Sequence, residues 1–146
     1  MSVLIIYHSE HHGNTKKIAE AMGELSGAVI SKAEEVNPED LDKHDIIGFG
    51  SGVYNGRLHN ELAEILDKLG KQEGKKAFIF STTGSSTYSA LAHERFRPVL
   101  EEKDFEIIGE FSCPGFDTAL TSEGINKGRP NQRDIDDAKK FIQKIL

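Results

Sequence analysis

Two consecutive stretches near the N-terminus decide the fold: VLIIY at residues 3–7 and SEHHGNT at residues 9–15. The first is a short, continuous apolar run rich in branched residues, which is typical of a strand buried on both faces of a sheet. The second is rich in small polar residues and leads into a segment with helical apolar spacing: Ile18, Ala19, Met22 and Leu25. Strand, polar loop and helix together predict the start of a β-α-β unit.

The same alternation continues along the chain. We expect further strands at residues 28–30, 45–50, 77–80 and 105–111, and further helices around residues 62–69, 91–100 and 135–145. Strands that alternate with helices at this spacing predict a parallel sheet covered on both faces. The predicted fold is therefore α/β: one domain over residues 1–146, with a doubly wound five-stranded parallel sheet of order 2-1-3-4-5 and helices on both faces.

The composition narrows the possible partners. Lys and Arg total 18 against 24 Asp and Glu, a formal net charge of −6, which argues against a nucleic-acid partner because such a partner requires a basic face. The single cysteine, Cys113, excludes an intrachain disulfide and favours a reducing compartment. Because no apolar run approaches the roughly 20 residues of a membrane span, and no signal-peptide pattern is present, we expect a soluble cytoplasmic protein without a membrane partner.

The loop at residues 9–15 has the properties of a phosphate site. Its backbone N–H groups, the hydroxyls of Ser9 and Thr15 and the amide of Asn14 could all donate to one phosphate. Lys16 and Lys17 in the first helical turn oppose the helix dipole by about 0.3–1 kcal/mol each, and a bound dianion would reverse that penalty. The alternative is a simple helix N-cap made by Asn14.

Ser9 followed by Gly13, Asn14 and Thr15, after an apolar strand, resembles the phosphate loop of flavodoxins. The resemblance covers the whole chain, and it implies non-covalently bound FMN and electron transfer between redox-protein partners. The chain departs from the family at His11 and His12, where flavodoxins usually have Ser or Thr in a loop that is often one residue shorter. Either histidine supplies a donor to the phosphate, or the pair lies in a solvated loop. A metal site at the pair has no obvious partner ligands.

The resemblance also assigns roles to three later loops. Tyr54 resembles the residue that stacks on the flavin ring, and Asn55-Gly56 resembles a turn whose peptide flips, which glycine permits because it tolerates positive φ. The alternative is an ordinary Asn-Gly turn beside a surface tyrosine. Cys113 is either a small buried apolar residue or a redox thiol. The residues implied in cofactor binding are Ser9, His11, His12, Gly13, Asn14, Thr15, Ser51, Gly52, Val53, Tyr54, Asn55, Gly56, Ser81, Thr82, Thr83, Gly84, Cys113, Phe116 and Asp117.

Two other uses of a doubly wound fold are excluded by single positions. A response-regulator receiver needs an aspartate at the end of the third strand, where this chain has Gly50 and Ser51, and a low-molecular-weight tyrosine phosphatase needs a cysteine in the first loop. We therefore expect a monomeric one-electron carrier with no catalytic residue and no metal, because the cofactor carries the chemistry. The alternatives are a flavin-dependent NAD(P)H or quinone reductase, and a flavodoxin-like activator of one partner enzyme.

Overall fold

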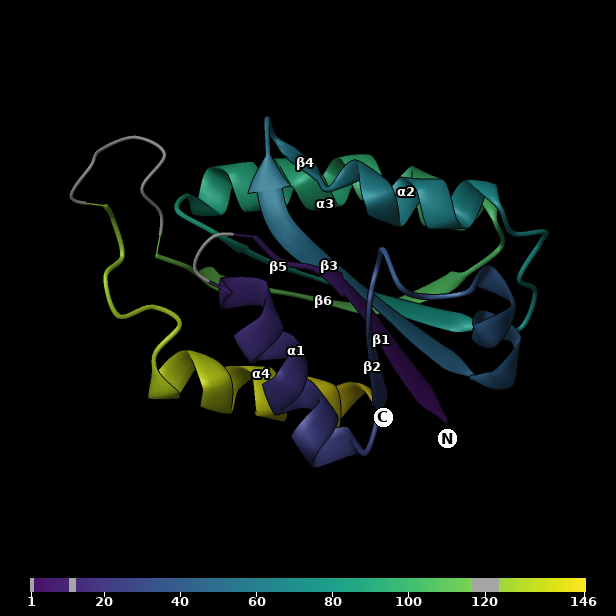
Figure 1. The fold of residues 1–146 in the computed structure, drawn as a ribbon, viewed down its shortest axis with the longest axis horizontal. Coiled ribbons are helices and arrows are strands. Elements are labelled where there is room, and N and C mark those ends of the chain that lie inside the picture. The colour runs from purple at the N-terminus through teal and green to yellow at the C-terminus, as the bar shows by residue number, and fades with distance from the viewer. Residues whose placement is uncertain (1, 11–12, 117–123) are drawn as a thin grey trace.

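A computed structural model describes residues 2–10, 13–116 and 124–146, and its centre is a twisted parallel sheet (Figure 1). The five parallel strands lie in the spatial order β2-β1-β3-β5-β6. This order confirms the predicted topology, since these strands are the first to fifth parallel strands of the chain. Their bounds are β1 (Val3–His8), β2 (Val29–Lys32), β3 (Ile46–Tyr54), β5 (Lys76–Thr83) and β6 (Glu106–Pro114).

Helices cover both faces of the sheet, as the alternating pattern predicts. Helices α1 (Asn14–Ser26) and α4 (Gln132–Ile145) lie on one face, and α2 (Asn60–Asp67) and α3 (Ser86–Glu102) lie on the other (Figure 1). A short 3-10 helix (Pro38–Lys43), which the sequence analysis did not predict, joins β2 to β3. None of the described helices is long and apolar enough to cross a membrane.

The alternation of side chains along β1 shows how the sheet separates two cores. Leu4 and Ile6 pack in the core beneath α2 and α3, whereas Ile5 packs in the core beneath α1 and α4. All three are at most 2% exposed, which explains why the strand reads as a continuous apolar run rather than an alternating one. By the same alternation, His8 at the end of β1 faces the α2 side.

The region after the third parallel strand differs from the prediction. Residues 51–54 are not loop but the last part of β3, which turns back into a short antiparallel strand, β4 (Arg57–Leu58). The reversal is a two-residue hairpin in which Asn55 and Gly56 have φ of 53° and 72°. Positive φ at both central residues is the requirement of a type I′ turn, and Asn-Gly is its preferred sequence. The loop prediction for this segment is therefore wrong.

Candidate functional site

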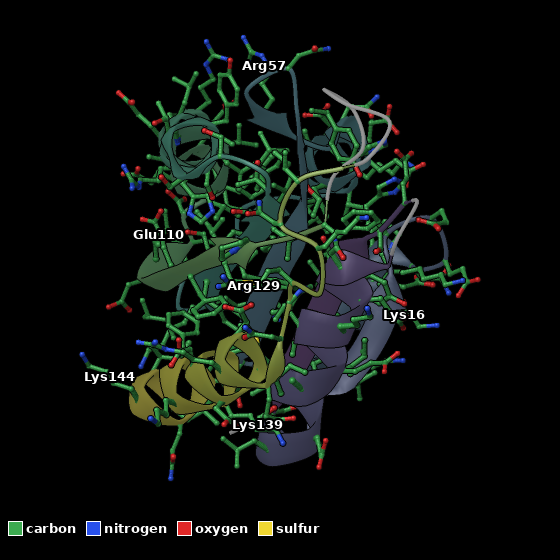
Figure 2. All side chains as sticks on the ribbon, turned by 90° about the vertical axis from the view of Figure 1, so that its left-hand side faces the viewer. Lys16, Arg57, Glu110, Arg129, Lys139 and Lys144 are labelled. Carbon is green, nitrogen blue, oxygen red and sulfur yellow. The ribbon has the colours of Figure 1, made fainter. Side chains whose placement is uncertain are left out.

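The N-terminus of α1 is open. Gly13, the N-cap residue, is in the left-handed conformation (φ 67°, ψ 25°) and has no side chain to cap the helix, and the first turn contains no acidic residue. The Ser9 hydroxyl accepts the Lys16 N–H at 3.3 Å. Within the described part of the chain, the N–H groups of Asn14 and Thr15 have no acceptor. These two donors and the helix dipole form a ready anion site at the carboxyl end of β1, the end of the molecule that faces the viewer in Figure 2.

Asn14 does not act as the N-cap of its own helix, so the alternative of a simple N-cap is wrong. It is the first helical residue, and its Nδ2 donates to the carbonyl of Phe116 at 2.8 Å. The approach is close enough that a Cβ on Gly115 would lie 2.6 Å from Nδ2, which explains the glycine there. The Asn14 Oδ1 is buried without a hydrogen-bond partner. Asn14 thus ties the start of α1 to the loop after β6.

Thr15 joins the same corner to β5. Its hydroxyl lies 2.8 Å from the hydroxyl of Thr82, and both side chains are buried. A hydroxyl pair has two protons and uses one for its mutual bond, so the second proton is available to a ligand. The structure therefore brings three of the predicted loops together at the start of α1.

The β3–β4 hairpin is held more firmly than a free loop. The Gly56 carbonyl accepts a hydrogen bond from Arg95 Nη1 of α3 at 3.1 Å. The Tyr54 ring lies edge-on to the rings of His59 and His8, with centroid distances of 5.1 and 6.1 Å. Burial, reinforced by the charge of Glu10, raises the pKa of Tyr54 to about 12.

This geometry limits the predicted peptide flip. Flipping the central peptide converts a type I′ turn into type II′, whose first central position is a glycine position. That position here is Asn55, so the flip has a conformational cost that the motif alone did not reveal.

Two predicted hydroxyls are engaged inside the protein. Ser51 accepts the His59 N–H at 2.9 Å and donates to the Gly52 carbonyl at 2.6 Å, which fixes the end of β3 to the start of α2. Ser81 is fully buried, with its hydroxyl 2.5 Å from the Ser89 hydroxyl and 2.7 Å from His93 Nε2. Neither hydroxyl is directed at a ligand in this arrangement.

The Ser81 network continues to the surface through two more side chains. His93 Nδ1 lies 2.9 Å from Glu110 Oε1, and Arg97 binds the Glu110 carboxylate at 2.6 and 2.9 Å. Burial lowers the pKa of His93, while hydrogen bonds from Arg97 and His93 outweigh burial and lower the pKa of Glu110. The order Ser-His-Glu is that of an activated nucleophile, but Ser81 is 0% exposed and no substrate can reach it. The network joins β5, α3 and β6.

The remaining predicted residues fall into three groups. Thr83, Gly84 and Cys113 border a cavity of about 270 Å³ between the ends of β5 and β6. Burial raises the pKa of Cys113 to about 12, which agrees with a buried apolar residue rather than a reactive thiolate. Val53 lies in β3 opposite Leu58. The predictions for His11, His12 and Asp117 lie outside the described residues.

The family follows from a sequence comparison that agrees with this geometry. The model of a family described as Flavodoxin domain matches residues 4–123. The chain belongs to this family. It is also 43% identical to a protein of Methanocaldococcus jannaschii named Uncharacterized protein MJ0298, in an alignment that covers 100% of this chain and 99% of that protein.

Solved structures share the flavodoxin fold at low sequence identity. Oxidised Flavodoxin 2 from Bacillus cereus has a TM-score of 0.77 at 20% identity, and the alignment covers 99% of this chain and 97% of that one. A Fusobacterium nucleatum flavodoxin bound to flavin mononucleotide has a TM-score of 0.70 at 11% identity, covering 99% and 97%. An apo NADH:FMN oxidoreductase also has a TM-score of 0.70, at 18% identity, covering 99% and 87%. These likenesses establish the fold.

Membership of the flavodoxin family supports FMN as the cofactor. The residues at the start of α1 fit the phosphate group of FMN. Among the described residues the N–H groups of Asn14 and Thr15 lack acceptors, and Gly13 leaves open space where a Cβ would stand. Lys16 and Lys17, which disfavour an empty helix start, favour one that holds a dianion.

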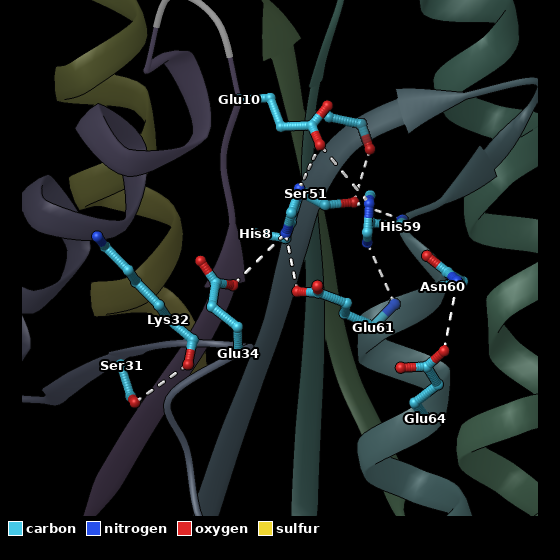
Figure 3. Close-up of polar contacts among 11 residues, drawn as sticks. His8, Glu10, Ser31, Lys32, Glu34, Ser51, His59, Asn60, Glu61 and Glu64 are labelled. Carbon is cyan, nitrogen blue, oxygen red and sulfur yellow. Dashed lines mark hydrogen bonds and ion pairs between the residues drawn. The ribbon is translucent and has the colours of Figure 1, made fainter.

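The structure also assembles a polar cluster that the sequence analysis did not predict. It consists of His8, Glu10, Glu34, His59 and Glu61, and is called the His8 cluster below (Figure 3). The only sequence signal was a histidine that continues the apolar run of β1. The other members come from separate loops and from α2, and their proximity depends on the tertiary fold.

Proposed function

We propose that this protein binds FMN without a covalent bond and carries single electrons between redox-protein partners. The observation that supports the proposal most directly is the uncapped start of α1, where free N–H groups meet the carboxyl end of a central strand. In open α/β sheets ligands bind beyond the carboxyl ends of the strands, at the point where the strand order reverses. Here that point lies between β1 and β3.

In this proposal each part of the site has a separate task. The N–H groups of Asn14 and Thr15, the free proton of the Thr15–Thr82 hydroxyl pair and Lys16 bind the phosphate. The hairpin of Tyr54 and the loops after β5 and β6 border the ring. FMN supplies the redox chemistry, and the protein supplies binding, orientation and electrostatics.

Charge favours a low reduction potential for the bound flavin. The formal net charge is −6, and several carboxylates of the His8 cluster lie at the same end of the sheet. A carboxylate about 8 Å from the ring, at an effective dielectric constant of about 20, raises the energy of an added electron by about 2 kcal/mol. We therefore expect the bound flavin to be hard to reduce fully. In the same proposal the protein is a cytoplasmic monomer without nucleic-acid or membrane partners.

A reductase is the competing function, because an NADH:FMN oxidoreductase shares the fold. An anaerobic reductive titration of the FMN-loaded protein distinguishes the two. A carrier is expected to show two well-separated one-electron steps and negligible oxidation of NADH or NADPH with a quinone acceptor. A single two-electron step together with steady nicotinamide turnover would reject the carrier and favour the reductase.

The hairpin provides a second test of the carrier. Gly56 has φ 72°, and a Cβ there would lie 3.1 Å from both Arg95 and Leu91. Gly56→Ala therefore strains the turn, by about 1–2 kcal/mol from the left-handed conformation alone. The flipped type II′ turn has negative φ at Gly56, so the strain falls on the unflipped turn alone and the flip is favoured. In this proposal the flipped carbonyl stabilises the singly reduced flavin, so we expect the two one-electron potentials to move further apart, while Gly74→Ala, at another positive-φ glycine with open space around it, leaves their separation unchanged.

A further inference from the structure

His8 lies among three carboxylates from three different parts of the chain (Figure 3). Its Nδ1 is 3.0 Å from Glu61 Oε2 and 3.6 Å from Glu34 Oε2, and its Nε2 is 3.0 Å from Glu10 Oε1. Glu61 belongs to α2, whereas Glu34 follows β2 and Glu10 follows β1. Side chains so distant in sequence converge on one imidazole only in the folded protein.

The charges of the His8 cluster do not balance within the protein. Glu34 and Glu61 carry two negative charges, and a protonated His8 offsets only one of them, which leaves a net charge of −1 on these three groups. Among the described residues, no lysine or arginine forms an ion pair with Glu34 or Glu61. A divalent cation at His8 Nδ1 replaces that proton, and its two positive charges balance the carboxylates of Glu34 and Glu61.

His8 is buried, and one of its two ring nitrogens has no aligned partner among the described residues. The His8 side chain is 9% exposed, and its Nε2 is buried without a hydrogen bond although Glu10 Oε1 is near. Buried polar atoms are nearly always hydrogen-bonded, so an unaligned contact at this depth requires an explanation. A small rotation of the ring about a bound metal would align Nε2–H with Glu10.

We propose that His8 Nδ1, Glu34 and Glu61 form a binding site for a first-row divalent transition-metal ion, for which Zn²⁺ is the best match. Metal–ligand distances of about 2.0–2.2 Å place the ligand atoms of a tetrahedral zinc about 3.3–3.6 Å apart. The observed distances from His8 Nδ1 to Glu61 Oε2 and to Glu34 Oε2 are 3.0 and 3.6 Å, which span this range. One imidazole nitrogen with two carboxylates suits zinc and its neighbours better than Mg²⁺.

Glu10 then has a positioning role. Metal-binding histidines usually donate their second N–H to a carboxylate, which fixes the tautomer and the ring orientation. His8 Nε2 and Glu10 Oε1, 3.0 Å apart, are close enough for that contact once the ring is rotated into line. In the metal-free protein a proton on His8 Nδ1 instead forms a hydrogen bond with Glu61 Oε2, 3.0 Å away.

The other possible ligand set, His8, Glu10 and His59, is geometrically worse. The two imidazole rings are stacked, with centroids 3.5 Å apart and planes 14° apart. Lone pairs of ring nitrogens lie in the ring planes, so two stacked rings cannot both direct them at one ion. In addition, His59 Nδ1 accepts the Glu61 N–H at 3.2 Å to cap α2, which leaves the proton of the neutral ring on Nε2.

Titration of the chelator-stripped full chain with Zn²⁺, measured by calorimetry, tests the site. We expect one ion per chain. Because loss of even an outer partner of a metal ligand costs about 10–100-fold in affinity, Glu34→Gln is expected to weaken binding by at least about tenfold. Glu35→Gln, at an exposed neighbour outside the cluster, should leave the affinity unchanged.

Two further variants assign the ligands. His59→Asn keeps an acceptor for the α2 cap and should retain Zn²⁺ binding; its loss would overturn the proposed ligand set. The double variant His11→Gln/His12→Gln should also retain it. Unchanged affinity in Glu34→Gln, or loss of binding only in the His11/His12 variant, would place the ion elsewhere and overturn the proposal. None of these measurements requires FMN, so the site stands or fails independently of the proposed function.

Discussion

Helices α1 and α4 lie side by side on one face of the sheet, yet they begin in opposite ways (Figure 1). At the start of α4, Asn131 accepts the Asp134 N–H at 3.0 Å, and Asp134 accepts the Asn131 N–H at 2.8 Å. Arg129 binds the same carboxylate at 2.6 and 2.7 Å. At the start of α1, Gly13 provides no side chain and two lysines occupy the first turn.

The two N-termini differ in role: that of α4 stabilises the fold, and that of α1 is suited to bind a ligand. The capping box of α4 satisfies the N–H groups of Asn131 and Asp134 and places a carboxylate at the positive end of the helix dipole, which stabilises the fold and disfavours an anionic ligand. The start of α1 is less favourable by itself, and an anion can satisfy the same groups. Substitutions at the start of α1 should therefore change FMN affinity, whereas substitutions at the start of α4 should change the stability of the fold.

The largest expected effect is on FMN affinity in Thr15→Ala. Loss of a hydrogen bond to the charged phosphate costs about 1.5–3 kcal/mol, which corresponds to a roughly tenfold to 150-fold higher Kd. Riboflavin lacks the phosphate, so its affinity should change little. Fluorescence titration with both flavins measures the difference.

Asp134→Asn is the matched control for this change, since it alters the start of α4 and should leave both flavin affinities intact. If Thr15→Ala weakened FMN and riboflavin equally, Thr15 would act on the ring or on the fold rather than on the phosphate.

The next effect concerns stability. Asp134→Ala removes the hydrogen bonds of a buried carboxylate to Arg129 and to the Asn131 N–H, and should lower the free energy of unfolding of the apo-protein by about 1.5–3 kcal/mol. FMN affinity at temperatures where the variant is folded should not change. Urea unfolding followed by circular dichroism gives the stability.

The same carboxylate predicts a pH dependence. The hydrogen bond from Arg129 lowers the pKa of Asp134 below its ordinary value of 3.8. A lowered native pKa stabilises the fold above the unfolded value, and this contribution is lost as pH falls below about 3.8 through the native value. Asp134→Asn should therefore have a flatter stability profile in this acidic range. An unchanged profile would mean that Asp134 is not the group responsible.

The smallest effect is expected at Lys16. Lys16→Gln removes one positive charge beside the phosphate and should weaken FMN by about 0.3–1 kcal/mol, or roughly two- to fivefold. Apo-protein stability should change little, because relief at the helix dipole offsets loss of the exposed Lys16–Glu20 ion pair, 3.9 Å long.

Salt provides the check on the Lys16 effect. The difference in FMN affinity should shrink at high ionic strength, because exposed charges are screened. Lys139→Gln, which removes an equal charge from α4, should have no effect on FMN. Equal losses in the two variants would indicate a response to net charge rather than to the start of α1.

Local patterns were sufficient for the fold and for the polar loop that leads into α1. The apolar run of β1, the helical spacing after it and the polar loop between them were each readable, because period and turn chemistry are properties of neighbouring residues. The Asn55-Gly56 turn was recognised but misassigned to a loop. Its sequence is also the strongest short-range hairpin signal, and the resemblance to a family motif took precedence over it.

The sequence by itself determined the doubly wound topology, the family and the open start of α1, since these depend on order and spacing along the chain. Only the tertiary structure decided what each polar side chain contacts: Asn14 with Phe116, Thr15 with Thr82, and the carboxylates gathered around His8. These contacts join residues up to 102 positions apart. No local pattern encodes them, because packing of helices and loops against the sheet sets which side chains meet.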